Sequence, residues 1–183
     1  MIRPITEVDV LRDFLPLMAE VEAGSWFDMS NSGHDEWLRR CVSRRIGRGG
    51  QFYALYCPED CPLGLCCLLI EDHPSFPGHA EILDMGVVEA HRRQGHGTHL
   101  VEDATRRATA AGVCCIYVST YAGDSDAVAF YTRVGFNRVA ELPGLNGPVD
   151  RGQVFMIKQL GQQVHAEATS KSARSAASEA SDA

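Results

Sequence analysis

Apolar side chains recur at helical spacing in two stretches near the amino terminus. The first follows Thr6, a residue type that caps helices through its hydroxyl, and extends to Val21. The second follows Ser32 and Asp35, a pair spaced like a capping box. The pattern predicts a short strand over 2–5 and then two helices. The buried stripe of the second helix comprises Trp37, Leu38, Cys41, Val42 and Ile46, and four arginines, Arg39, Arg40, Arg44 and Arg45, are predicted to face solvent.

Short apolar runs replace the helical spacing beyond these helices. Gln51–Cys57, Leu63–Glu71 and Ala80–Val88 each have the length and composition of a β-strand. The turn-forming residues from Pro58 to Pro62 separate the first two runs. We therefore predict an antiparallel meander of three strands.

Helices and strands alternate in the second half of the chain. One helix begins after a glycine-rich junction and ends at Gly112, and a strand over Val113–Thr120 follows it. Because one helix joins the strands on either side of it, those strands should lie parallel. A helix over Asp126–Val134 and strands over Asn137–Glu141 and Gln153–Gln159 complete the order. The predicted fold class is α+β, with a central mixed sheet of about seven strands flanked by helices on both faces.

The glycine-rich junction reads Arg92-Arg93-Gln94-Gly95-His96-Gly97-Thr98. Two glycines let the backbone turn tightly and leave N–H groups of the next helix's first turn without partners. The helix dipole makes such a terminus attractive to anions, and two arginines add positive charge. The junction therefore predicts binding of a phosphorylated ligand.

Two common phosphate-binding motifs do not fit this junction. A Walker-type loop needs Gly-Lys followed by Ser or Thr, and a dinucleotide fingerprint needs a third small residue where this chain has Leu100. The strand after the helix also ends in Thr120-Tyr121 without the carboxylate that would bind a ribose. The ligand is therefore of another class.

The chain resembles the GNAT superfamily of N-acetyltransferases. Arg92, Gly95 and Gly97 match the family's pyrophosphate loop, and the segment from Asp124 to Phe136 resembles its second signature, a helix that carries a Tyr and closes in Gly-Phe. The family usually has Asn where this chain has Asp124. The resemblance covers about residues 1–160 and is most specific over 79–136.

The resemblance implies that acetyl-CoA is the co-substrate. Its pantetheine arm would pair with one strand of the sheet where two parallel strands separate, and its pyrophosphate would lie on the glycine loop. The implied cofactor-binding residues are Met85, Gly86, Val87, Arg92, Arg93, Gln94, Gly95, His96, Gly97, Thr98 and Asp124.

Acetyl transfer to an amine needs a group that removes a proton and a group that supplies one. A protonated amine cannot attack the thioester, and Glu81 occupies the position at which the histone-modifying branch of the family has its base. Asp84 is the second candidate, and its odd offset predicts that the two carboxylates lie on opposite faces of the strand. Tyr131 occupies the family's acid position, where it would protonate the departing thiolate.

Composition limits the class of partner. A net charge of −7 and a pI of 5.4 argue against nucleic acid as a partner and favour a cationic small-molecule amine. Acidic and aromatic residues of two loops, 22–35 with Trp26 and Asp28, and 141–150, would attract such an amine. Peptide N-termini and protein lysines remain open, as do a homodimer and a non-catalytic acyl-CoA-binding regulatory domain.

The remaining expectations concern location, metals and the carboxyl-terminal segment. The chain lacks an apolar run of membrane-spanning length, so no membrane partner and a cytoplasmic location are expected. Seven cysteines, four of them in two adjacent pairs, predict buried thiols rather than disulfides.

Cys57 and Cys61 could join a nearby histidine around zinc, but the spacing favours no metal site. Residues 1–160 are predicted to form one catalytic domain, and the Ala- and Ser-rich tail 161–183 is predicted to be disordered.

Overall fold

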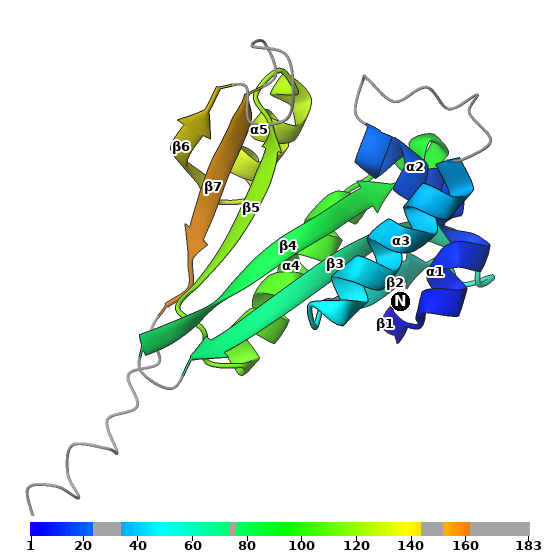
Figure 1. Cartoon of the computed structure of the whole chain (residues 1–183), viewed down its shortest axis with the longest axis horizontal. Helices are drawn as coiled ribbons and strands as arrows, with labels where there is room; N and C mark the ends of the chain where they lie inside the picture. Colours follow the sequence, from blue (N-terminus) through cyan, green and yellow to red (C-terminus); the bar gives the residue numbers. More distant parts are fainter. Residues whose placement is uncertain (24–33, 74–75, 144–151, 162–183) are drawn as a thin grey trace, which may run out of the picture.

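The computed structural model describes residues 1–23, 34–73, 76–143 and 152–161, and these form one mixed seven-stranded sheet covered by helices (Figure 1). The strand order is β1-β2-β3-β4-β5-β7-β6. The strands are β1 Ile2–Ile5, β2 Gln51–Tyr56, β3 Pro62–His73, β4 Phe76–Val87, β5 Cys115–Tyr121, β6 Asn137–Leu142 and β7 Gln153–Gln159. The antiparallel meander β2-β3-β4 and the parallel pair β4-β5 are as the sequence predicts.

The helices lie on both faces of this sheet. They are α1 Glu7–Asp13, α2 Leu15–Ala23, α3 His34–Gly47, α4 His96–Ala110 and α5 Ser125–Arg133. One apolar core joins α1, α2 and α3 to alternate residues of β2 and β3, and a second core lies under α4. Adjacent Cys66 and Cys67 show the alternation, since each belongs to a different core and both are buried. All seven cysteines are free thiols.

The single helix expected after Thr6 is in fact two helices, and that prediction is wrong. Thr6 does cap α1 through a capping box with Asp9. The helix ends at Asp13, Phe14 adopts a non-helical φ of −123°, and α2 starts at Leu15. Pro16 explains the break, because proline lacks the N–H that a continuous helix needs but fits the first turn of a new one.

The carboxyl end of α3 also differs from the expectation. Ile46, predicted to be buried, is exposed. Arg45, predicted to face solvent, turns toward β4, where its side chain is mostly buried. Its neighbours Arg39, Arg40 and Arg44 are exposed as expected. The arginine run is therefore not a uniform solvated face.

A β-bulge in β4 places Glu81 and Asp84 on one face of the sheet. Leu68 pairs with Ile82 and Cys67 pairs with Asp84, which leaves Leu83 as an extra residue in β4. Both carboxylates consequently meet arginines at the end of α3. The prediction of opposite faces is wrong, because strict alternation ends at the bulge.

Candidate active site

A cleft opens where β4 and β5 separate. The two strands pair only from His79 with Cys115 to Ile82 with Val118. Beyond this point β5 pairs with β7, and the β4 residues Asp84–Val87 pair with β3 alone. The divergence of β4 and β5 is visible in Figure 1. The cavity beside it has a volume of about 1100 Å³. This arrangement leaves one edge of β4 free to bond an extended, amide-bearing ligand.

The glycine loop forms one end of the cleft. Gly95 is the residue before α4 and has a φ of +87°, a conformation that favours glycine. The N–H groups of the first turn, from His96 to Thr98, have no acceptor within a helix, and Gly95 has no side chain to cap them. A Cβ at Gly97 would lie 3.2 Å from the Phe130 ring. The backbone conformation therefore favours glycine at position 95, and the close approach of the Phe130 ring favours it at position 97.

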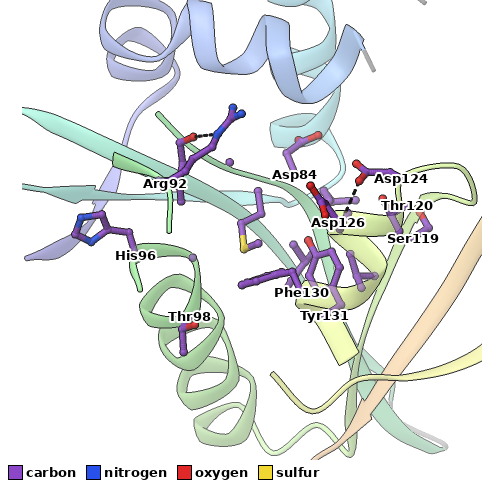
Figure 2. A pocket seen from close by; sticks show the side chains of 18 of the residues that line it. Asp84, Arg92, His96, Thr98, Ser119, Thr120, Asp124, Asp126, Phe130 and Tyr131 are labelled. Atoms are coloured by element: carbon purple, nitrogen blue, oxygen red, sulfur yellow. Dashed lines mark hydrogen bonds between the residues drawn. The ribbon is translucent and has the colours of Figure 1, made fainter. Parts of the chain in front are cut away.

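The arginines before Gly95 are arranged differently from each other. Arg92 Nε donates to the Val87 carbonyl at 2.9 Å, which ties the loop to the end of β4 (Figure 2). Arg93 has a positive φ of 64° and, like Arg92, lines the cleft. Gln94 does not line it, and its side-chain amide donates to the Ala90 carbonyl. Met85, Gly86, Val87, His96 and Thr98 all border the cavity.

Asp124 lines the cleft as the N-cap of α5. Its carboxylate accepts a hydrogen bond from the Ala127 N–H at 2.9 Å. Aspartate is a preferred N-cap residue, so this role explains the residue type without a ligand. The sequence signal for this capping role is the position of Asp124 immediately before the predicted helix.

Tyr131 extends from α5 into the cavity wall beside Phe130 (Figure 2). The residue is only 6% exposed, and its ring packs against Phe130 and Phe136. Burial raises the pKa of its phenol well above the usual range, and charges including Asp84 raise it further. Its hydroxyl has no hydrogen-bond partner among the described residues. Tyr131 is thus a neutral phenol whose proton is available to the cavity.

The two carboxylates of β4 are each paired with an arginine. Asp84 accepts two hydrogen bonds from Arg45, at 2.9 Å and 3.2 Å, and its side chain is 3% exposed. Glu81 accepts one bond from Arg48 Nη2 at 3.2 Å, and its side chain is 15% exposed. Tyr117 hydrogen-bonds to Glu81, and burial together with this bond raises the pKa of that tyrosine. All four ion-pair residues line the cleft.

Sequence reasoning did not single out Arg45 and Arg48 as site residues. Their placement depends on where α3 ends relative to β4, more than thirty residues away along the chain. Several other lining residues were also missed because nothing local marks them: Leu17, Ser119, Thr120, Tyr121, Asp126 and Arg133.

Some expectations fall outside the described residues. Ser32, Trp26, Phe27, Asp28, most of the loop 141–150 and the tail 162–183 belong to this group. Within the described residues, no group of three or more His, Cys, Asp or Glu side chains is arranged to hold a metal ion. No helix in the described part of the chain combines the length and apolarity needed to cross a membrane.

Comparisons with known proteins place the chain in a family. The sequence model of the acetyltransferase (GNAT) family matches residues 17–136. No curated protein sequence matches the chain.

Many solved structures share the fold. IAA acetyltransferase from Bacillus cereus ATCC 14579 is 19% identical, with a TM-score of 0.66 over 87% of this chain and 99% of that one. Ribosomal-protein-S18-alanine N-acetyltransferase from Escherichia coli is 16% identical, with a TM-score of 0.66 over 91% and 97%. A GNAT family acetyltransferase from Elizabethkingia anophelis with acetyl-CoA bound is 15% identical, with a TM-score of 0.66 over 87% and 97%. The fold and the family match agree: the chain belongs to the GNAT family and is an acetyl-CoA-dependent acetyltransferase.

Proposed function

We propose that the protein transfers the acetyl group of acetyl-CoA to a primary amine of a small molecule, by direct attack while both substrates are bound. The observation that carries this proposal is the cleft formed where β4 separates from β5. The N–H groups at the start of α4 and the buried phenol of Tyr131 lie on either side of this cleft. No cysteine is among the described residues that line the cleft. An acetylated cysteine intermediate therefore has little support, and direct attack is the simpler route.

The described residues fit acetyl-CoA. The free N–H groups at the start of α4 and the side chains of Arg92 and Arg93 suit a pyrophosphate. The unpaired edge of β4 from Met85 to Val87 suits the two amides of a pantetheine arm. When bound, acetyl-CoA supplies the acetyl group as an activated thioester.

Glu81 is proposed as the base that takes the proton from the ammonium of the acceptor. Its carboxylate accepts one bond from Arg48, whose side chain is 48% exposed, and one from Tyr117. A carboxylate has about four acceptor positions, so it keeps capacity for another partner. Asp84 is a weaker candidate for this role because both of its oxygens accept bonds from Arg45 and its side chain is 3% exposed. A base must reach its proton within hydrogen-bond distance, so exposure to the cleft favours Glu81.

Tyr131 is proposed as the acid that protonates the departing sulfur. The raised pKa keeps its hydroxyl protonated across the neutral range. The phenol lies in the cavity wall and has no competing acceptor among the described residues. Both features support a proton donor.

The test is release of free thiol from acetyl-CoA in the presence of primary amines. The panel contains polyamines, aminoglycosides, amino acids and short peptides, each at several concentrations. We expect thiol release that depends on an amine, with intersecting initial-rate patterns that indicate a ternary complex. Acetyl-CoA binding without thiol release on any amine would overturn the proposal and favour a non-catalytic acyl-CoA-binding domain. Turnover of peptides alone would favour the alternative that the acceptor is a peptide N-terminus or a protein lysine.

A further inference from the structure

The ion pair between Arg48 and Glu81, in which only Arg48 is well exposed, is complementary in charge to an amino acid. Its guanidinium would face the carboxylate of the amino acid, and its carboxylate would face the ammonium. It places one guanidinium and one carboxylate side by side, with Arg48 Nη2 3.2 Å from Glu81 Oε2. Both residues line the cleft at the end nearest α3. If Glu81 takes the proton of the acceptor's amine, then the group attached beside that amine lies next to Arg48.

Arg48 is held in place by the way α3 ends. The Gly49 N–H donates to the Ile46 carbonyl at 2.8 Å and the Gly50 N–H donates to the Arg45 carbonyl at 2.9 Å. These two bonds form a Schellman motif, in which Gly49 adopts a φ of +93°. The backbone of Arg48 is therefore fixed at the rim of the cleft, and only its side chain is free to adjust.

Arg48 also has hydrogen-bonding capacity to spare. Its Nη2 donates to Glu81, and no other side-chain bond of Arg48 is formed within the described residues. A guanidinium has five N–H donors in a planar fork that matches a carboxylate. With 48% of its side chain exposed, Arg48 can donate Nη1 and the second hydrogen of Nη2 to a ligand without giving up Glu81.

The neighbouring pair cannot do the same. Arg45 and Asp84 engage each other through two bonds and their side chains are 19% and 3% exposed. A ligand would have to break that fork and leave a buried charge without its partner, which is costly. Of the two arginines that α3 brings to the described part of the cleft, Arg48 is therefore the suitable receptor for a ligand carboxylate.

We propose that the acceptor is a free α-amino acid, whose ammonium lies at Glu81 and whose carboxylate lies on Arg48. This inference rests on the proposed acetyl transfer to a primary amine and specifies its substrate class. The amine and carboxylate of an α-amino acid are attached to one carbon, which matches two receptor groups in direct contact. A peptide N-terminus has an uncharged amide at that position and cannot use Arg48 in this way.

The test compares acceptors that differ only in the carboxylate. Each of several side chains is presented as the amino acid, as its carboxamide and as its decarboxylated amine, for example phenylalanine, phenylalaninamide and phenethylamine. The measured quantity is kcat/KM for each acceptor with acetyl-CoA saturating. The enzymes are wild type, Arg48→Gln, Arg48→Lys and the control Arg44→Gln, which removes an exposed charge from the same helix.

We expect wild type to prefer at least one amino acid over its carboxamide by about tenfold or more in kcat/KM, mainly through KM. Arg48→Gln should abolish this preference, Arg48→Lys should retain part of it, and Arg44→Gln should keep all of it. Using the ratio between acid and amide cancels any effect of Arg48 on Glu81 that both acceptors share.

Two results would overturn the inference while leaving acetyl transfer intact. One is equal or better turnover of carboxamides and decarboxylated amines throughout the panel. The other is a preference for amino acids that persists in Arg48→Gln. Failure of every amine, with acetyl-CoA still bound, would instead reject the proposed function itself.

Discussion

Two arginine–carboxylate pairs join the end of α3 to β4, and they differ in burial. Arg45 and Asp84 form a two-bond pair with side-chain exposures of 19% and 3%, whereas Arg48 and Glu81 form a one-bond pair with exposures of 48% and 15%. Within each element the partners lie three residues apart. An arginine and a carboxylate at the same spacing are therefore found in two different environments.

This difference indicates that one pair stabilises the fold and that the other is available to a substrate. A buried pair is hard to break, because removing one partner leaves a charge in a poorly solvated site. An exposed pair contributes little to stability, and its members can exchange partners at low cost. We assign Arg45 and Asp84 to holding β4 against α3, and we assign Glu81 and Arg48 to the acceptor substrate.

The largest expected effect comes from breaking the buried pair. Asp84→Ala should lower the free energy of unfolding by about 3–5 kcal/mol, because Arg45 would keep its charge without the carboxylate. Denaturant unfolding followed by circular dichroism measures this loss. Arg45→Met combined with Asp84→Leu should recover most of it, because an apolar pair needs no charge partner. A loss no larger than that of Glu81→Gln would erase the distinction between the two pairs.

Glu81→Gln should reduce activity without reducing stability. We expect kcat to fall about a hundredfold, the size of effect typical of a lost general base. The free energy of unfolding should change by less than about 1 kcal/mol, because the pair with Arg48 is partly exposed. Steady-state kinetics with the accepted amine and a binding titration with acetyl-CoA make the measurement. An unchanged kcat would remove Glu81 as the base.

Tyr131→Phe should have a smaller effect on turnover and a distinct pH signature. We expect kcat to fall about tenfold, because a thiolate with a reference pKa of about 8.5 departs without much help from an acid. Burial raises the Tyr131 pKa, so its proton is retained as the pH passes 10 and the rate should not decline through loss of that proton between pH 8 and 10. A decline in wild type that vanishes in the Phe variant would contradict this assignment of the pKa.

The smallest effect is expected at the turn that fixes Arg48. Gly49→Ala should lower the free energy of unfolding by about 1 kcal/mol, because its φ of +93° is unfavourable for alanine. Gly47→Ala is the matched control, since a Cβ there meets nothing within 4 Å and its φ is not positive. Equal stability of the two variants would indicate that the turn adapts to alanine. The backbone of Arg48 would then be held less firmly than its proposed role in binding the acceptor requires.

The sequence by itself determined the type and order of the elements and the residues of the glycine loop. These features depend on neighbours a few positions apart: apolar spacing, the cap at Thr6, and glycines where a helix must begin sharply at Gly95. The break between α1 and α2 also had a local signal in Pro16, which the helical spacing of apolar residues obscured. Tyr131 could be predicted as a candidate acid because its position in the α5 segment resembles a family signature.

Only the tertiary structure decided which charges meet at the end of the cleft beside α3. The bulge at Leu83 turns Glu81 and Asp84 to one face, and its position depends on pairing with β3 rather than on the residues of β4 alone. Arg45 and Arg48 reach those carboxylates because α3 packs across the sheet and ends beside β4. Register and packing are long-range properties, so the difference between a buried and an exposed ion pair could not be seen from the order of residues.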